Sequence, residues 1–260
     1  LHNRIEELAD AGITSFKIEG RLKNVSYVRN IVRYHSMKLD EIASRRPSEY
    51  ERGSYGRVRS SFIPDPDKTF NRGYTELYLD GKRGKWAAMD AAKSMGEEIG
   101  TVISTNRDKT SISIRPSKKG ITLNNGDGFS FVGKDGNVTG FRGDVCEGTG
   151  IRCKSVPEIH VGARLFRNID SAFEKELDRI PCTREIQTKV RVSFKRTEDG
   201  WELSVIARSE DGRTIVKTLN IEGEEAKNRV RMEEIIRGQI GKNADIYSFS
   251  VEEIQSQGNL

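Results

Sequence analysis

The chain has 260 residues, of which 35% are hydrophobic and 32% charged, with a net charge of +5. This length suggests two domains or one large one, with modest cores beneath much polar surface. No apolar run approaches the roughly 20 residues that span a bilayer, and the start of the chain lacks the hydrophobic segment of a signal peptide, so we expect a cytoplasmic protein with no membrane partner. The positive charge permits an RNA partner without establishing one, because charges of both signs are interspersed.

The first residue is Leu1 rather than Met, so we expect the chain to be a fragment of something longer. Its three cysteines are Cys146, Cys153 and Cys182. An odd count at irregular spacing argues against a disulfide framework and fits a reducing cytoplasm. We interpret them as small buried or loop thiols, not as a metal pair, so we expect no metal ligand in this chain.

Residues 1–45 have the pattern of a helix, a strand and a second helix. Apolar residues at helical spacing predict a helix over residues 1–11, which Gly12 ends. Alternation predicts a strand over residues 13–19, and an apolar stripe predicts a helix over residues 24–44. Helix–strand–helix is typical of the end of a TIM-like α/β barrel. Because such a barrel needs about 250 residues, we expect most of it to be missing.

Residues 46–95 are interpreted as a connector that packs on the barrel, beginning with a polar loop rich in Pro and Gly. Residues 96–185 then show short segments with strand patterns, separated by turn residues. The predicted strands are residues 99–103, 111–115, 128–132 and 138–142, and a helix is predicted over residues 169–177. Strands this short at this spacing predict a small antiparallel β-barrel.

Residues 186–260 are predicted to form an α+β module. Strands over residues 189–197, 201–209 and 214–219 are joined by Asp-Gly turns, which are strong hairpin signals. A helix over residues 224–240 is expected to turn Ala226, Val230, Ile235 and Ile236 inward, and a last strand follows at residues 246–251. The predicted fold class is therefore mixed α/β and β: the end of a TIM-like barrel, a small antiparallel β-barrel and an α+β module.

Three ionisable residues lie at the end of the first predicted strand. Because side chains alternate along a strand, Lys17, Glu19 and Arg21 share one face. Ligands of parallel α/β folds bind at this strand end, so the three residues are candidates for anion binding, with Arg21 contacting the ligand and Glu19 orienting its neighbours. A salt-bridged cluster at the barrel rim is the equally weighted alternative.

Further candidate ligand-binding residues are Lys23, just beyond this strand, and Asn71 and Arg72, on a loop after the proline-rich connector. Many basic residues around this connector are interleaved with aromatic ones, a mixture that suits RNA because bases stack on aromatic rings while cations neutralise phosphates. The basic residues are Arg45, Arg46, Arg52, Arg57, Arg59, Lys68, Arg72, Lys82, Arg83 and Lys85. The aromatic residues are Tyr50, Tyr55, Phe62, Phe70 and Tyr74. The alternative, an ordinary solvated loop whose aromatic residues fill a domain junction, is favoured slightly.

The chain also resembles a known family. The run of residues 16–23, F-K-I-E-G-R-L-K, resembles the end of the barrel in the peptidase U32 (collagenase-like) family. The likeness continues in residues 70–75, 125–128 and 140–142, and extends past residues 211–212, so it covers nearly all of the chain in matching order. The layout is most similar to the ribosomal RNA cytidine hydroxylase subgroup of this family.

This resemblance implies that the full-length protein hydroxylates a cytidine base with the help of an iron–sulfur cluster. The cluster ligands would lie in the missing part of the barrel, and ribosomal or transfer RNA would be the partner. We expect residues 1–260 alone to be inactive, and we single out no catalytic residue. The alternatives are a U32 peptidase and a non-catalytic RNA- or protein-binding module, although no serine- or metallo-peptidase motif is present. The sequence does not indicate an oligomeric state.

Overall fold

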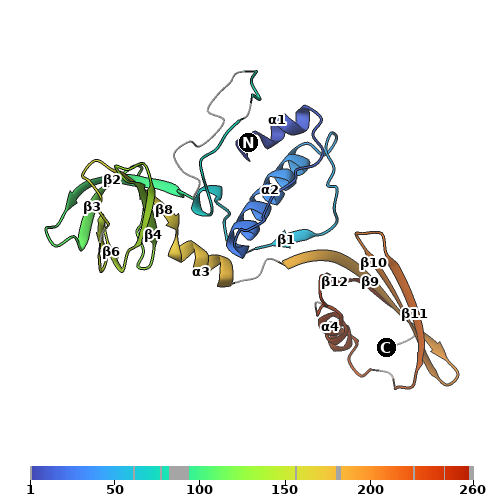
Figure 1. Ribbon diagram of the computed structural model, residues 1–260. Helices are drawn as coiled ribbons and strands as arrows, with labels where there is room; N and C mark the ends of the chain where they lie inside the picture. The colour runs from blue at the N-terminus through green and yellow to red at the C-terminus, as the bar shows by residue number, and fades with distance from the viewer. Residues whose placement is uncertain are drawn as a thin grey trace. The chain divides into compact units, whose positions relative to one another are not determined.

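The computed structural model describes residues 2–60, 62–76, 78–81, 94–155, 157–179, 183–224, 226–242 and 244–257. The chain divides into two compact units (Figure 1). The first comprises Leu1–Tyr50 and Ser60–Pro181, and the second Glu51–Arg59 and Cys182–Leu260. Cys182 and the basic residues Lys82, Arg83 and Lys85 lie outside the described residues. The division into residues 1–45, 46–95, 96–185 and 186–260 stays a prediction.

The first unit begins with helices, as predicted. A 3-10 turn, η1 (His2–Arg4), leads into α1 (Ile5–Asp10), and α2 (Val25–Arg45) follows. Gly12 has a φ of 90°, and its N–H donates to the carbonyl of Ala9 at 2.9 Å. This bond and the one from Ile13 to Leu8, at 3.0 Å, form the hydrogen-bond pair that commonly ends an α-helix.

The strand predicted over residues 13–19 is not present as a strand. This segment runs between α1 and α2 without the hydrogen-bond ladder that defines a sheet. The alternating pattern is in the sequence, but a strand also needs a neighbouring strand to accept its N–H groups and donate to its carbonyls. Among the described residues, no strand pairs with this segment, so it stays an irregular connection.

A curled antiparallel sheet forms the second part of the first unit (Figure 1). After η2 (Pro66–Lys68), its strands pair in the order β5-β4-β8-β2-β3-β7-β6. The strands are β2 (Glu97–Thr105), β3 (Ser111–Pro116), β4 (Gly128–Val132), β5 (Val138–Arg142), β6 (Val145–Glu147), β7 (Gly150–Arg152) and β8 (Arg164–Ile169). Because β5 and β6 remain as edges, the sheet is a half-barrel and not the closed barrel that the sequence predicts.

The half-barrel encloses the largest apolar cluster of the described chain. The side chains of this cluster are Ile99, Val102, Ile112, Ile114, Leu123, Phe129, Phe131, Ile151, Cys153, Ala163 and Leu165. All four strands predicted here are confirmed. Apolar residues of β2, β3 and β4 belong to this cluster, and Phe141 of β5 packs against it. The strands β6, β7 and β8 were not predicted. Two of them have three residues each, too few for a periodic pattern.

Helix α3 (Ser171–Arg179) connects the half-barrel to α2 and confirms the helix predicted near its position. The Ser26 hydroxyl donates to the carboxylate of Glu174, and Arg29 Nη1 donates to the carbonyl of Leu177 at 3.1 Å. The rings of Phe62 and Phe173 meet edge to face, with 6.3 Å between centroids. These contacts join the N-terminal helices and the half-barrel within one unit.

The second unit is a five-stranded sheet with one helix. The strand β9 (Thr183–Thr197) pairs with β1 (Arg57–Arg59), β10 (Gly200–Ser209) and β12 (Tyr247–Gln257), and β11 (Thr214–Ile221) forms the edge beyond β10. The pairing is antiparallel except for β12, which runs parallel to β9. This confirms a mixed module of strands and helix, and β1 is an addition from a segment predicted to be a loop.

Helix α4 (Arg229–Ile240) lies close to the predicted position, but the prediction that its apolar residues point inward is wrong. The side chains of Val230 and Ile235 are 69% and 51% exposed, and the helix buries no residue. Apolar residues at helical spacing become buried only where another element covers them. In the described residues, β12 is the main contact of α4 and does not cover this stripe.

Candidate nucleic-acid interface

A surface groove of about 360 Å³ brings together three of the predicted ligand-binding residues. Lys23 and Tyr27, at the start of α2, line one side of this groove, and Asn71 and Arg72 line the other. The side-chain oxygen of Asn24 accepts the N–H of Tyr27 at 3.0 Å, and this N-cap fixes where α2 begins. The groove therefore forms where the start of a helix meets a loop from the connector.

Two cations lie over the ring of Phe70 in this groove. Lys23 Nζ lies 3.3 Å from the centroid of the Phe70 ring, and Arg72 Cζ lies 5.0 Å from it. Tyr27 meets the same ring edge to face at 6.1 Å. Contacts between a cation and a ring hold side chains at defined positions while leaving the charges near solvent. The groove thus combines an aromatic ring with two positive charges, the two kinds of group that contact bases and phosphates in single-stranded nucleic-acid sites.

Asn71 has a structural position within the groove. Its side chain is buried, and its Oδ1 accepts the N–H of Gly73 at 2.6 Å. Its carbonyl accepts the N–H groups of Met95 and Gly96 at 2.9 and 3.2 Å. These bonds shape the loop that carries Arg72 and hold it against the segment that enters β2.

Lys17, Glu19 and Arg21 form a separate cluster outside the residues that line the groove. Lys17 Nζ lies 3.0 Å from Glu19 Oε1, and Arg21 Nε lies 3.8 Å from Glu19 Oε2. The Lys17 and Arg21 side chains are 85% and 90% exposed, so these ion pairs contribute little to folding. Glu19 contacts both cations, which is the geometry expected of a residue that orients them.

The interleaved basic and aromatic residues separate into two groups. Several have structural contacts: Arg46 pairs with Glu49 and Asp10, Lys68 with the buried Asp170, and Phe62 is itself buried. The Tyr74 ring packs on His2, with 4.4 Å between centroids. Of the whole set, Phe70, Arg72 and Tyr74 line the groove, where Lys23 joins them. Sequence proximity alone could not separate these groups.

The two described cysteines lack the properties of nucleophiles or metal ligands. Burial, followed by nearby negative groups such as Asp127, raises the pKa of the Cys146 thiol to about 11. Burial also raises the pKa of Cys153. Since the thiolate is the form that attacks a substrate or binds a metal, both side chains are poorly suited to either task. Within the described ranges, no three His, Cys, Asp or Glu side chains gather as a metal site.

Comparison with known proteins identifies the N-terminal segment. The family model described as peptidase family U32 matches residues 1–88. Residues 1–88 are a peptidase U32 family segment. The resemblance seen in the sequence is thus confirmed, and this U32 segment contains every residue of the groove.

The similarity to one curated protein extends well beyond the U32 segment. The 23S rRNA 5-hydroxycytidine C2501 synthase of Escherichia coli (strain K12) is 32% identical over 232 residues, or 85% of this chain. The chain spans 34% of the length of that relative. No solved structure matches the chain. None of the described helices is long and apolar enough to cross a membrane.

Proposed function

We propose that this chain is the C-terminal part of a U32 protein that hydroxylates a cytidine base in ribosomal RNA. Support comes from the similarity to the 23S rRNA 5-hydroxycytidine C2501 synthase, which continues over 85% of the chain. The proposal assigns most of the catalytic centre to a barrel outside these 260 residues. Residues 1–260 alone would then bind RNA without modifying it.

The observation that carries the RNA part of this proposal is the contact of the Phe70 ring with both Lys23 and Arg72. Base stacking on an aromatic ring contributes about 1–3 kcal/mol per base and tolerates any sequence. A base that stacks on the ring would displace a cation from its face, and the two cations would then neutralise the phosphates of the same strand. Lys23 and Arg72 are therefore proposed to contact RNA, and Asn71 to position Arg72.

An exposed apolar stripe supports the proposal that residues 1–45 end a TIM-like barrel. Val25, Val28 and Val32 lie on one face of α2 and are 63%, 38% and 46% exposed. A helix with such a stripe normally packs against another element. Barrel strands from outside this chain would cover the stripe and also pair with residues 13–19. Lys17, Glu19 and Arg21 would then lie at the barrel mouth as anion-binding residues.

The residues present do not fit the iron–sulfur cluster that the family resemblance implies. Such a cluster is held mainly by cysteine thiolates. The described cysteines, Cys146 and Cys153, both have raised pKa values because they are buried. The proposal therefore assigns the cluster ligands to the part of the protein outside this chain, and no step of the reaction is assigned to residues described here.

A U32 peptidase is the second candidate, favoured by the description of the matching family model. The two candidates differ in what the intact protein does to RNA and to peptides. The test is to delete the gene in its host and to measure hydroxycytidine in ribosomal RNA by mass spectrometry. Loss of the nucleoside and its return with the wild-type gene is the expected result. An unchanged amount of hydroxycytidine, together with peptide cleavage by the purified protein, would favour the peptidase over the RNA hydroxylase.

The role of the groove is tested in the same strain with the variants Lys23→Glu and Arg72→Glu. We expect each to lower the amount of hydroxycytidine while the protein level is maintained. Lys38→Glu is a matched control, because Lys38 is a partly exposed lysine of α2 outside the groove. If all three variants restore hydroxycytidine equally, the groove has no part in RNA binding.

A further inference from the structure

A second cavity opens in the half-barrel, at the end opposite the groove. Its volume is about 500 Å³, and it is lined by Thr105, where β2 ends. The groove adjoins the other end of the same strand, because Asn71 accepts hydrogen bonds from Met95 and Gly96, just before β2 begins. A strand of nine residues spans roughly 25 Å, so the cavity is distinct from the groove.

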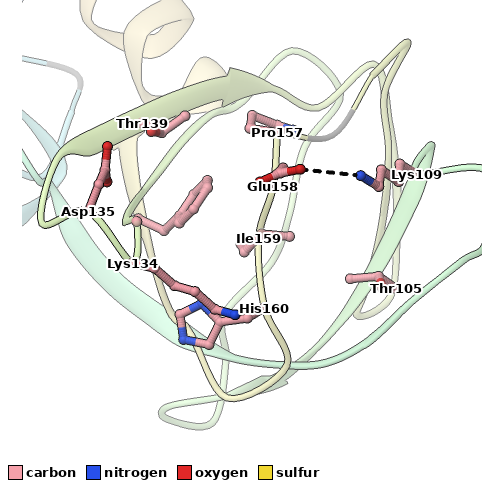
Figure 2. A pocket seen from close by; sticks show the side chains of 11 residues that line it. Thr105, Lys109, Lys134, Asp135, Thr139, Pro157, Glu158, Ile159 and His160 are labelled. Atoms are coloured by element: carbon pink, nitrogen blue, oxygen red, sulfur yellow. Dashed lines mark ion pairs between the residues drawn. The ribbon is translucent and has the colours of Figure 1, made fainter.

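The floor of this cavity is apolar. Phe131, from β4, and Ile159, from the loop before β8, line it, and both belong to the core cluster or pack on it. Figure 2 shows the residues around this floor coming from three separate segments: the β2–β3 turn, the β4–β5 hairpin and residues 157–160. A volume of this size and an apolar floor suit a planar ring of the size of a nucleobase with its sugar.

The rim carries a lysine from each of two of these segments. They are Lys134, on one side of the cavity beside the His160 ring, and Lys109, on the other side (Figure 2). Lys134 forms no ion pair with any described residue, and the Lys109–Glu158 pair, at 3.7 Å, is largely exposed. Because an exposed pair is weak, Lys109 can exchange Glu158 for a phosphate at little cost.

The second carboxylate of the cavity, Asp135, is hydrogen-bonded within its own turn. Asp135 accepts the backbone N–H of Asn137 at 3.0 Å and its side-chain amide at 2.7 Å. These bonds lower the pKa of Asp135 and direct its charge into the β4–β5 turn. Asp135 stays ionised, so Lys134, which has no ion pair among the described residues, is the cation best placed to meet an anionic ligand.

We propose that this cavity binds one unpaired nucleotide of an RNA strand, with the base over Phe131 and Ile159 and the phosphates at Lys134 and Lys109. This inference rests on the proposed function, because it assumes an RNA substrate. It adds a second contact point at the far end of β2 from the groove. One protein would then hold an RNA at two places within a single unit.

The test measures the affinity of the intact protein for a fluorescein-labelled single-stranded RNA of about 12 nucleotides, by fluorescence anisotropy at several salt concentrations. Lys134→Glu and Lys109→Glu are each expected to weaken binding about fivefold and to reduce the salt slope by about one. Lys119→Glu makes the same charge change on an exposed residue of the β3–β4 loop, away from the cavity lining, and should keep wild-type affinity. An RNA of equal length with abasic sites should also bind more weakly.

Equal losses of RNA affinity in all three variants would overturn the cavity proposal, because a lysine outside the cavity would then contribute as much as the lysines that line it. Wild-type affinity in Lys134→Glu and Lys109→Glu would also overturn it while leaving RNA binding at the groove intact. Complete displacement of the RNA by stoichiometric cytidine monophosphate would assign the cavity to a free nucleotide and overturn the RNA assignment. Absence of any RNA binding by the wild-type protein would instead remove the proposed function itself.

Discussion

Arg167 Nη2 lies 2.9 Å from Glu97 Oε2, and both side chains are almost fully buried. The same guanidinium group lies 3.2 Å from Asp170 and 3.4 Å from Asp127. Asp127 in turn accepts the N–H of Ser171, at the start of α3. Three buried carboxylates therefore share Arg167, with Lys118 pairing with Glu97 and Lys68 with Asp170 as further cations. The cluster connects the half-barrel to the helix that contacts α2.

Replacing Arg167 with Met should destabilise the protein strongly. The substitution keeps much of the side-chain volume but leaves Glu97, Asp127 and Asp170 without their shared cation. Removing one partner of a buried ion pair typically costs about 3–5 kcal/mol of unfolding free energy. Urea unfolding followed by circular dichroism measures this loss. The matched change Arg164→Met, on the same strand at an exposed pair with Glu98, should cost about 1 kcal/mol or less. Equal costs at the two positions would contradict this account.

The same cluster predicts how stability depends on pH. Burial alone would raise the pKa of Glu97, but hydrogen bonds from Lys118 and Arg167 outweigh it and hold that pKa below its ordinary value of 4.5. A depressed pKa in the folded state adds stability above pH 4.5, which is lost as the pH falls through the folded-state pKa. Urea midpoints between pH 7 and pH 3 should therefore fall less steeply in Glu97→Gln than in the wild type. An unchanged slope in this variant would show that Glu97 does not carry the effect.

The raised pKa of Cys146 predicts slow alkylation. A shift from 9.0 to about 11 leaves about a hundredfold less thiolate at neutral pH than in an unperturbed thiol. Iodoacetamide labelling at pH 7.5, followed by peptide mass spectrometry, measures each cysteine separately. Labelling of Cys146 at the rate of free glutathione would restore it as a candidate nucleophile, and urea-unfolded protein provides the fast-reacting control.

Asn71 and Arg72 are neighbours in the candidate interface, but replacing them should change different quantities. Replacing Asn71 should lower the unfolding free energy, and replacing Arg72 should lower the RNA affinity. Asn71→Ala removes the acceptor of the Gly73 N–H and should cost about 1 kcal/mol of unfolding free energy. Asn71→Asp keeps an acceptor and should restore most of it. Arg72→Ala should leave the unfolding free energy unchanged and lower RNA affinity. Thermal unfolding and RNA anisotropy on the same three variants separate the two roles. Loss of stability in Arg72→Ala would assign both residues to the fold.

The local elements could be predicted from sequence because their signals are local. Alternation over residues 111–115 and Asp-Gly at residues 211–212 determine a strand and a turn within a few residues. Residues 13–19 have the same kind of pattern, yet they form no strand, because the partner must come from elsewhere. The apolar stripe of α4 has the same limitation as a predictor. Its helical spacing predicts a helix but does not predict whether another element covers the stripe, and α4 buries no residue.

The candidate interface is predictable only in part, because sequence position identifies its residues but not their contacts. Lys23 and Arg72 were identified as candidates from their positions beside a predicted strand and a proline-rich loop. Both side chains lie over the ring of Phe70. This contact arises from tertiary packing, so no spacing in the sequence predicts it. The sequence does not predict the cavity with Lys134 and His160, because it forms only where segments far apart in the chain meet in the fold.

Gly96, the residue directly before β2, is predicted to tolerate no larger side chain. Gly96 has a φ of 79°, and a Cβ built on it would lie 2.0 Å from the carbonyl oxygen of Arg167. Backbone cannot move aside as the end of a flexible side chain can, so Gly96→Ala should displace β2 from β8 beside the Arg167 cluster. We expect a loss of about 3 kcal/mol or more in unfolding free energy. Gly120→Ala is the matched control: its φ is 86°, but no atom lies within 4 Å of the added Cβ. Only backbone strain of about 1 kcal/mol remains there, so similar losses at the two glycines would show that the close approach to Arg167 is unimportant.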